Sequence, residues 1–415
     1  MRPISTARAT SLLHTLSNPR SMSTTTPARR ERALPASFYR GGTSKAVIFQ
    51  RAHLPPDQTQ WDPIFLSAIG SPDPNGRQLD GMGGGLSSLS KVVVLDRSSH
   101  PHADVDYTFV QVHVRAPVAD YGSNCGNMLS AVGPFALEHG LVAPHPLPGG
   151  ETLVRILNTN TNKIVHASFP VHADAPAEPD LSGEFAIDGV AGTHARITLD
   201  FVDPSGSRTG KLFPTGRVVD ELRLPGGSIP ATLMDCGNPC VYVLASDLGL
   251  DPTILPPDLE NDRAMLEKLA AIRAAASVRM GLVPNVEAAA GMKSVPKVCI
   301  MSAPSTHTVL SGATLGPDSV DVVTRCISAD DPHRALPITA SLCTAAAAQV
   351  PGTLVHGLVS GPRVSNAGIV IGHASGTIEV GADVVQLDSG EWVVPKARVF
   401  RTARKLFEGN VYYKV

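Results

Sequence analysis

Short apolar segments, separated by glycine and proline, run along most of this chain and predict a protein built largely from β-strands. Many of them are rich in valine and isoleucine and are bounded by turn residues, which is the pattern of strands rather than of helices. The segments with this pattern are residues 45–50, 91–95, 105–114, 152–157, 195–201, 240–245, 297–301, 368–372, 377–380 and 392–394.

Helical patterns are fewer, and two of them resemble each other. The helix expected at 127–139 should end at Gly140, and the helix expected at 341–349 should stop at Pro351. Both are apolar or made of small residues on all sides, which is the composition of a helix enclosed by protein. Each follows a short polar segment and precedes a strand-rich stretch. The chain is therefore predicted to fold as two similar halves, each a sheet around a central helix, with both helix N-termini directed at one cleft. The remaining helices are expected at residues 61–69 and 259–280.

The length of the chain also favours two domains, because a single core rarely grows to 415 residues. A proline- and glycine-rich span at 203–227 is the candidate boundary. We expect a first domain at 33–205, completed by a C-terminal strand at about 397–415, and a second domain at 206–396.

Residues 1–32 differ from the rest of the chain and are left out of the fold prediction. Residues 1–30 hold five arginines, many serines and threonines and no acidic residue, which is the composition of a mitochondrial transit peptide. The segment therefore predicts import into the mitochondrial matrix. The alternative is a disordered tail on a cytoplasmic protein, with Met22 as an internal start.

The composition argues against several classes of protein. Charged residues make up 17% of the chain and the net charge is -2, without a basic stripe, so nucleic acid is not an expected partner. No apolar run is long enough to cross a bilayer, and no membrane partner is expected. The six cysteines lack the paired spacings of metal sites, which predicts free thiols in a reducing compartment and no bound metal.

Two segments carry most of the candidate chemistry. The first, Asp80-Gly-Met-Gly-Gly-Gly-Leu-Ser-Ser-Leu-Ser-Lys91, offers bare backbone N–H groups, hydroxyls and one lysine. It lacks the Gly-Lys-Ser/Thr continuation of a phosphate-binding loop, so a nucleotide is not expected. The second, Asn124-Cys-Gly-Asn127, places Cys125 just before a helix, where the helix dipole favours thiolate and other anions. Together they indicate proton-transfer chemistry on a carboxylate substrate, with no cofactor.

Each of these residues also has a plainer interpretation. Lys91 opens a strand and could be an ordinary solvated charge, since lysine is usually exposed. Cys125 could be a small buried apolar residue. Arg40 could bind a substrate carboxylate or anchor a C-terminal acid, whereas Arg401 and Arg404 are expected to form ion pairs on the last strand.

Several motifs, taken in order, resemble those of the PrpF family, and the resemblance runs from about Ser37 to the C-terminus. The motifs are Arg40-Gly-Gly-Thr-Ser-Lys45, Gly70-Ser-Pro-Asp73, Asp80-Gly-Met-Gly-Gly-Gly85, Ser87-Ser-Leu-Ser-Lys91, Asn124-Cys-Gly-Asn127, Asn158-Thr-Asn-Thr161, Asp235-Cys-Gly-Asn-Pro239, His373-Ala-Ser-Gly376 and Arg401-Thr-Ala-Arg404. The resemblance implies the α+β fold of diaminopimelate epimerase, in which two similar domains each wrap a barrel-like sheet around a central helix. It also implies cofactor-independent isomerisation of unsaturated acids such as aconitate, 2-methylaconitate, methylitaconate or oxalomesaconate.

The same resemblance implies that Lys91 is the catalytic base and that Cys125 lies beside the substrate. The related epimerases use two cysteines, one at each central helix. Here Thr339-Ala-Ser341 stands at the second helix, and Cys343 is one or two turns too deep. One base that removes and returns the proton from a single face is therefore favoured over two-thiol chemistry.

We therefore predict an isomerase that moves a proton along the allylic system of an unsaturated tricarboxylate, with Lys91 as general base and Cys125 as its helper. A homodimer is one possible assembly. Two alternatives stay open. One is an epimerase or racemase of a small acid, with Cys343, Ser341 or Ser375 as the second acid–base group, and the other is a non-catalytic tricarboxylate-binding protein. The groups expected to hold the substrate are Arg40, Thr43, Ser44, Gly84, Gly85, Ser87, Ser88, Asn124, Gly126, Asn127, Ser341, His373 and Ser375.

Overall fold

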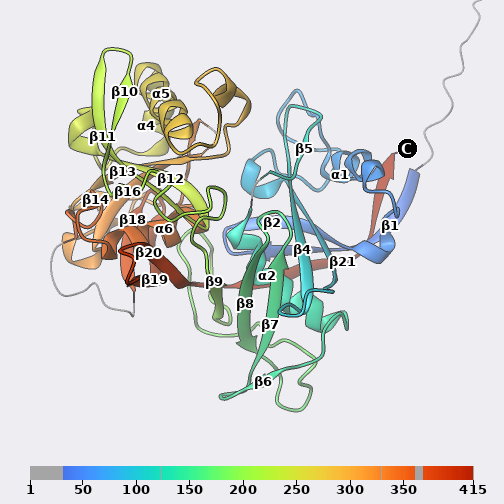
Figure 1. Cartoon of the computed structure of the whole chain (residues 1–415). Coiled ribbons are helices and arrows are strands. Elements are labelled where there is room, and N and C mark those ends of the chain that lie inside the picture. Colours follow the sequence, from blue (N-terminus) through green and yellow to red (C-terminus); the bar gives the residue numbers. More distant parts are fainter. Residues whose placement is uncertain (1–30, 123, 329, 360–367, 415) are drawn as a thin grey trace, which may run out of the picture.

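The computed structural model describes residues 31–122, 124–328, 330–359 and 368–414. The prediction of a disordered tail or transit peptide covers residues 1–32, of which 1–30 lie outside the described residues. Glu31 and Arg32 already belong to the first strand and pair with the C-terminal strand. The described chain forms two lobes, one around helix α2 (Gly126–Glu138) and one around helix α6 (Ile338–Gln349) (Figure 1).

The first lobe is a twisted sheet wrapped around α2. Its elements are β1 (Glu31–Gly41), β2 (Ser44–Gln50), α1 (Trp61–Ile69), β3 (Lys91–Arg97), β4 (Val105–Val112), β5 (Ala119–Asp120), β6 (Pro146–Leu147), β7 (Glu151–Asn158), β8 (Lys163–Pro170) and β9 (Ile197–Val202). The strand order is β1-β2-β3-β4-β7-β8-β9, in which the pairs β2/β3 and β4/β7 are parallel and the others antiparallel. Every second side chain of β7 is buried, and α2 contacts β7 and β8, because alternating residues of a strand face the same side.

The second lobe repeats this arrangement around α6. Its elements are β10 (Asp220–Leu224), β11 (Gly227–Cys236), β12 (Asn238–Leu244), α3 (Ala245–Leu248), α4 (Pro256–Asn261), α5 (Arg263–Arg279), β13 (Lys297–Ser302), β14 (His307–Thr308), β15 (Thr314–Leu315), β16 (Val322–Ser328), β17 (Asp331–Pro332), β18 (Ile369–His373), β19 (Gly376–Gln386) and β20 (Trp392–Arg401). The order is β11-β12-β13-β16-β18-β19-β20, with β12/β13 and β16/β18 parallel. The six pairings of the first lobe thus recur in the same sequence, and the prediction of two similar halves is confirmed.

The C-terminal strands join the two lobes. β20 pairs with β19 of the second lobe and with β9 of the first, and β21 (Ala403–Lys414) pairs with β1 (Figure 1). The sheet is therefore continuous between the halves, and β20, which begins at Trp392, pairs with the first lobe from Lys396 onward. The division of the chain at residues 205 and 206 stays a prediction.

The single helix expected at 259–280 is wrong. The structure has two helices there, α4 and α5, because Asp262 adopts a non-helical conformation and its carboxylate accepts a hydrogen bond from the Met265 N–H. A short acidic side chain is favoured at such an N-cap, where it satisfies a backbone donor that the helix leaves free. Helix α6 also begins at Ile338, directly after Pro337, and not at residue 341.

Candidate active site

The N-termini of the two central helices meet between the lobes. Gly126 is the first residue of α2, and Ile338 is the first residue of α6. A Cβ atom placed on Gly126 would lie 2.6 Å from both Cβ and Cγ2 of Ile338, so this approach needs a residue without a side chain. The positive ends of both helix dipoles therefore lie in one region, which favours bound anions.

Each helix start is tied to the tip of a hairpin in its own lobe. In the first lobe the Asn127 amide donates to the Thr43 hydroxyl at 3.1 Å, and the Thr43 N–H donates to the Asn127 side chain at 3.4 Å. In the second lobe the Asn238 amide donates to the Thr339 hydroxyl at 2.9 Å. These bonds fix both hairpins against the helix N-termini, so Thr43 and Asn127, two predicted substrate-binding residues, also have a structural role.

Lys91 is a buried amine, contrary to the usual state of lysine. It is the first residue of β3, is 7% exposed, and its Nζ donates to Gln111 Oε1 at 2.5 Å and lies 5.1 Å from the centre of the Phe109 ring. Burial lowers the pKa of Lys91, the charge of Lys297 lowers it further, and the charge of Cys125 raises it. Lys91 can therefore be neutral at a lower pH than a free lysine, which a general base requires.

Gln111 connects Lys91 to the segment that precedes it. The Gln111 side-chain amide donates to the backbone carbonyls of Ser87 and Ser90 at 3.1 and 3.0 Å, while its oxygen accepts from Lys91. The predicted residues Ser87 and Ser88 lie in the 3₁₀ turn Ser87–Leu89, one residue before Ser90. This places the serine segment beside the lysine.

The glycine loop is organised around Gln78, which the sequence analysis did not identify. The Gln78 oxygen accepts hydrogen bonds from the Gly85 N–H at 2.8 Å and the Ser90 hydroxyl at 2.6 Å, and a Cβ on Gly83 would lie 2.3 Å from it. Gly85, expected to donate its N–H to the substrate, thus already donates it within the loop. The close packing explains the glycine at 83, whereas for Gly84 the nearest group is the Leu89 side chain.

Cys125 is the N-cap residue of α2 and is partly buried. Its Sγ lies 4.0 Å from the hydroxyl of Ser44, and its backbone carbonyl accepts a hydrogen bond from the Tyr107 hydroxyl at 3.1 Å. The charge of Cys125 raises the pKa of Lys91, so the thiol and the amine interact electrostatically. The side-chain oxygen of the neighbouring Asn124 is buried and has no partner among the described residues, so it can accept from a ligand.

Two predicted binding residues have polar atoms engaged within the fold. Nη1 of Arg40 donates to the carbonyl of Gly42 at 3.1 Å and to the carbonyl and hydroxyl of Thr402 at 3.0 and 2.9 Å, and so holds the hairpin to the C-terminal strands. Nη2 of Arg40 is buried and has no partner among the described residues. Ser341 is fully buried, and its hydroxyl donates to the Ile338 carbonyl at 2.7 Å within α6. Cys343 is likewise fully buried, with its thiol directed to the Met234 carbonyl.

His373 and Ser375 lie in the turn between β18 and β19, which touches the first lobe. His373 Nδ1 accepts a hydrogen bond from the Ser375 N–H at 3.1 Å, and the Ser375 hydroxyl donates to the Arg334 carbonyl. The next strand begins with the Thr377 N–H donating to Asp188 of the first lobe at 2.5 Å. The turn therefore bridges the lobes.

Sequence reasoning missed two further groups of this region, Lys297 and His333. Lys297 is 8% exposed, and its charge lowers the pKa values of both Lys91 and His333. Burial is the main cause that lowers the pKa of His333 to about 4. A signal was present, because Lys297 opens an apolar β-branched strand in the second half as Lys91 does in the first.

The ion pair expected for Arg401 is wrong. Arg401 is 7% exposed, its Nη1 donates to the Phe400 carbonyl at 2.9 Å, and its Nε has no partner among the described residues. Burial lowers the pKa of Arg401 to about 9, and burial together with the Arg401 charge lowers the pKa of His373 to about 3. Lys91, Lys297, His333 and Arg401 thus bring several basic groups into the interior, and in the described part of the chain none of them forms an ion pair with a carboxylate.

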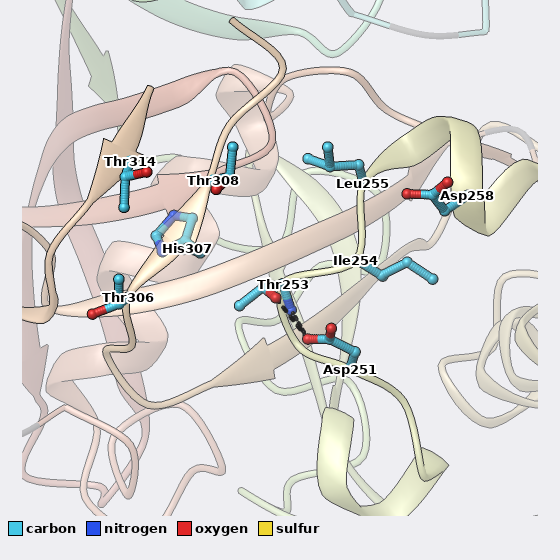
Figure 2. Close-up of a pocket in the computed structure, with 9 residues that line it drawn as sticks. All are labelled: Asp251, Thr253, Ile254, Leu255, Asp258, Thr306, His307, Thr308 and Thr314. Atoms are coloured by element: carbon cyan, nitrogen blue, oxygen red, sulfur yellow. Dashed lines mark hydrogen bonds between the residues drawn. The ribbon is translucent and has the colours of Figure 1, made fainter. Parts of the chain in front are cut away.

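A separate surface pocket lies in the second lobe and contains none of these residues (Figure 2). It lies where the segment before α4 faces β14 and β15, and its polar lining includes Asp251, Thr253 and His307. The Asp251 carboxylate already accepts bonds from the Thr253 N–H and hydroxyl, both at 2.7 Å. Within the described ranges, no cluster of three metal-ligating side chains is present, and no helix is long and apolar enough to span a membrane.

Comparison with known proteins gives consistent matches over nearly the whole chain. The family profile described as PrpF protein matches residues 31–414. The 2-methyl-aconitate isomerase of Shewanella oneidensis is 40% identical over 386 residues, which cover 91% of this chain and 96% of that protein. The 3-methylitaconate isomerase of Eubacterium barkeri is 38% identical, covering 91% of this chain and 97% of the relative.

Two solved structures show the same fold. The crystal structure of a methylitaconate-delta-isomerase aligns with a TM-score of 0.77 at 36% identity, over 92% of this chain and 96% of that one. A hydroxyproline epimerase from Agrobacterium vitis aligns over 93% of this chain and 94% of its own, with a TM-score of 0.52 at 15% identity, and so shares the fold alone.

Proposed function

Because the chain belongs to the PrpF family and is an isomerase, we propose that it moves a proton along the allylic system of an unsaturated tricarboxylate of the aconitate or 2-methylaconitate type. The relatives named above act on related unsaturated acids according to their names. The reaction shifts a double bond, or interconverts cis and trans isomers when the skeleton rotates before the proton returns.

The uncompensated cations of the site carry this proposal. Lys297 and Arg401 are each less than 10% exposed, and no described carboxylate pairs with either of them or with Lys91, which acts as the neutral amine. Burying unpaired charge is unfavourable, so a polyanion that enters this region gains a strong electrostatic attraction. A substrate with several carboxylates fits such a site, whereas a neutral or cationic substrate does not.

In the proposed mechanism, neutral Lys91 removes a proton from the carbon between a carboxylate and the double bond. The electron pair of the broken C–H bond enters the allylic system, and the negative charge spreads onto a carboxylate. The charge of Lys297 and the positive ends of the helix dipoles stabilise this developing charge. Cys125, whose charge interacts with Lys91, assists as an acid or by contact with the intermediate.

The direct test is incubation of the purified protein with aconitate, 2-methylaconitate, methylitaconate and oxalomesaconate in heavy water, followed by NMR. Double-bond movement with deuterium incorporation is the expected result for at least one acid. Deuterium uptake at a stereocentre of an amino or hydroxy acid, without double-bond movement, would instead support an epimerase. Binding of tricarboxylates without any turnover would support a non-catalytic binding protein.

The pH dependence of the reaction should report the environment of Lys91. Since only the neutral amine accepts a proton, kcat/KM should rise with pH through an apparent pKa below 10.5, the ordinary value for lysine. Burial and the charge of Lys297 both lower this pKa, so the rise moves toward neutral pH. An ascending limb centred at or above 10.5 would contradict the assignment of Lys91 as the base.

Replacement of Cys125 by serine should weaken the activity without abolishing it. A serine hydroxyl keeps a hydrogen-bonding group but does not ionise in this pH range, and we expect kcat to fall about 10-fold. The charge of Cys125 raises the pKa of Lys91, so the ascending limb of the pH profile should move to lower pH in Cys125→Ser. Complete loss of activity in a folded variant would make Cys125 essential rather than auxiliary.

The location and assembly of the protein remain proposals. The organisms of the named relatives are bacteria, and none of these comparisons supports the mitochondrial expectation from residues 1–30. We therefore propose the cytoplasmic alternative, together with a homodimer. Fractionation of cells that produce the full chain, and light scattering of the purified protein, measure the two properties separately.

A further inference from the structure

The internal repeat places Lys297 at the position that corresponds to Lys91. Each lysine is the first residue of the second strand in a parallel pair, with Ala46 opposite Lys91 and Cys240 opposite Lys297. The two strands, β3 and β13, follow equivalent hairpins and precede equivalent antiparallel partners, β4 and β16. The two amines therefore enter the site from opposite lobes.

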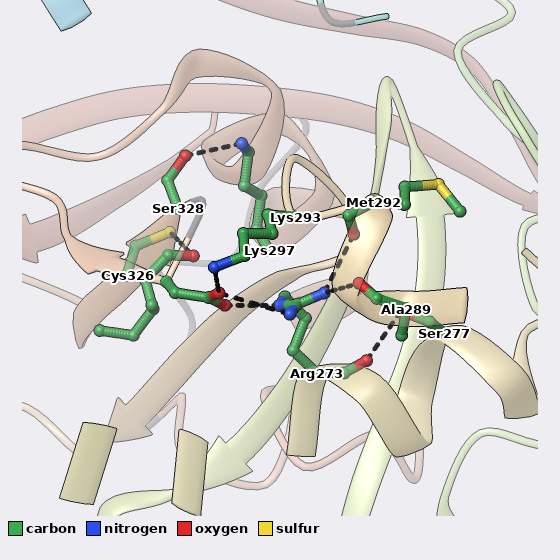
Figure 3. Close-up of polar contacts among 10 residues, drawn as sticks. Arg273, Ser277, Ala289, Met292, Lys293, Lys297, Cys326 and Ser328 are labelled. Atoms are coloured by element: carbon green, nitrogen blue, oxygen red, sulfur yellow. Dashed lines mark hydrogen bonds and ion pairs between the residues drawn. The ribbon is translucent and has the colours of Figure 1, made fainter. Parts of the chain in front are cut away.

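The contacts of the two lysines are also equivalent. Lys91 Nζ donates to Gln111, which is directly opposite it on β4. Lys297 Nζ lies 2.7 Å from the hydroxyl of Ser328 on β16 (Figure 3). The neighbouring pair Val298 and Ile327 shows that Ser328 is opposite Lys297 in the strand register. In both lobes a neutral polar side chain, and not a carboxylate, holds the amine. A serine hydroxyl can accept from an ammonium and donate to a neutral amine, so Ser328 suits both protonation states of Lys297.

The surroundings of Lys297 separate it from an ordinary ion-paired lysine. The nearby Lys293 pairs with Asp330 at 3.0 Å, and Arg273 pairs with the same carboxylate at 2.6 Å. Lys293 is 57% exposed, whereas Lys297 is buried and does not join this network. Asp330 and its two partners, Arg273 and Lys293, form an ion-pair cluster just after β16, the strand that carries Ser328. This cluster does not compensate the charge of Lys297.

Lys297 also interacts with the residues that form the site in the first lobe. Its charge acts on Lys91 and on His333, and the charge of Cys125 acts on both lysines. The thiol thus lies within electrostatic reach of both amines. Cys343 and Ser341, two of the three residues that the sequence offers as a second acid–base group, have their polar atoms bonded inside the second lobe.

We propose that Lys297 is a second acid–base residue of the reaction, which protonates the intermediate at the carbon remote from the one that Lys91 deprotonates. This inference rests on the proposed function. Lys91 takes a proton and becomes an ammonium, and the C–H electron pair becomes part of the delocalised anion. The Lys297 ammonium then gives a proton to the other end of the allylic system, where the new C–H bond forms, and becomes neutral. Exchange of protons with solvent resets both amines after the product leaves.

The experiment separates proton removal from double-bond movement. In heavy water the neutral amine of Lys91 carries two deuterons. After it has taken a proton from the substrate, it returns a deuteron more often than that proton, so the recovered substrate gains deuterium. Lys297→Met should retain this wash-in of deuterium into recovered substrate within about 3-fold, while isomerisation falls about 100-fold. Lys91→Met should lose both reactions. Lys293→Met, which changes a nearby exposed lysine, should keep both.

Three results would overturn the proposal. Unchanged isomerisation in Lys297→Met would remove Lys297 from the reaction. If deuterium wash-in and isomerisation fell equally in Lys297→Met and were both restored in Lys297→Arg, the role of Lys297 would be charge neutralisation alone. Substantial transfer of deuterium from a labelled substrate to the product of the wild-type enzyme in ordinary water would show that a single base carries the proton.

The labelled-substrate measurement needs no variant and remains decisive if Lys297→Met does not fold. The proposed function itself fails in a different way, because the wild-type protein would then convert none of the acids in the panel. The role of Lys297 alone would be rejected by the following combination of results. The wild type isomerises a tricarboxylate, Lys91→Met does not, and the label is transferred directly from substrate to product.

Discussion

Replacement of Lys91 by methionine is expected to lower kcat by about 10³-fold or more while the protein still binds a tricarboxylate. A positioned general base contributes roughly 10²- to 10⁴-fold to a proton transfer, and no other described residue takes the place of Lys91 on β3. Initial rates of isomerisation, followed by NMR or by absorbance of the conjugated product, measure the loss. Calorimetric titration with the same acid measures the binding that remains.

The physical reason for a large effect on rate with little effect on folding is the burial of the amine. Lys91 is 7% exposed and has no carboxylate partner among the described residues, so its ammonium form is desolvated without compensation and burial of the amine is unfavourable. Methionine has a similar length and no charge, and it packs against apolar groups such as the Phe109 ring. The thermal midpoint should therefore stay the same or rise.

A matched control comes from an exposed lysine. Lys268 lies on the exposed side of α5 in the second lobe, and Lys268→Met should leave both kcat and KM unchanged. If Lys91→Met kept activity within about 10-fold of the wild type, the base would have to be another group. Lys297 would then be the first to examine.

Substitution of Gly126 by alanine is expected to lower kcat about 100-fold by pushing the two central helices apart. The added Cβ would lie 2.6 Å from Cβ and Cγ2 of Ile338, which belong to a branched side chain fixed at the start of α6. Such overpacking destabilises a protein by about 1–3 kcal/mol. The helix N-termini meet there, and Cys125, which precedes Gly126, acts electrostatically on both lysines. A displacement of about 1 Å between the lobes is therefore enough to misalign substrate and base.

The control for this variant lies on the same helix. A Cβ on Gly133 would come within 2.5 Å of the Phe169 ring, inside the core of the first lobe and away from α6. Gly133→Ala should lower the thermal midpoint by a similar amount but leave the kcat of the folded protein unchanged. In the Gly126→Ala background, Ile338→Ala removes the Cγ2 contact and should restore part of the activity. Full activity of Gly126→Ala at a reduced thermal midpoint would show that the contact serves stability alone.

Local sequence patterns predicted those features whose causes lie close together in the chain. Strands such as β3 follow from a β-branched run, and α1 has the bounds that its apolar spacing predicts, because each pattern matches the period of its own element. The helix at 259–280 failed for the opposite reason. Its apolar spacing is continuous, but the capping preference of Asp262 interrupts the backbone there.

Sequence patterns pointed clearly only to the part of the candidate site that the first lobe contributes. Lys91 and Cys125 stand in distinctive motifs, and their interaction agrees with that expectation. Arg40 and Ser341 have suitable side chains, yet their hydrogen bonds to Thr402 and Ile338 can be known only from the packing of distant segments. Gln78, which organises the glycine loop, has no sequence signal of its own because its partners lie several residues away in an irregular loop.

By itself the sequence determined the two-fold repeat of strands and central helices and the family, and it predicted Lys91 and Cys125 as site residues. Only the tertiary structure decided that Gly126 meets Ile338, that Arg401 is buried without an acid among the described residues, and that Lys297 is a buried amine whose charge acts on Lys91. The physical reason is that periodicity and capping act over a few residues. The burial and charge of a side chain depend instead on sheet register and on how two lobes, far apart in the chain, come together.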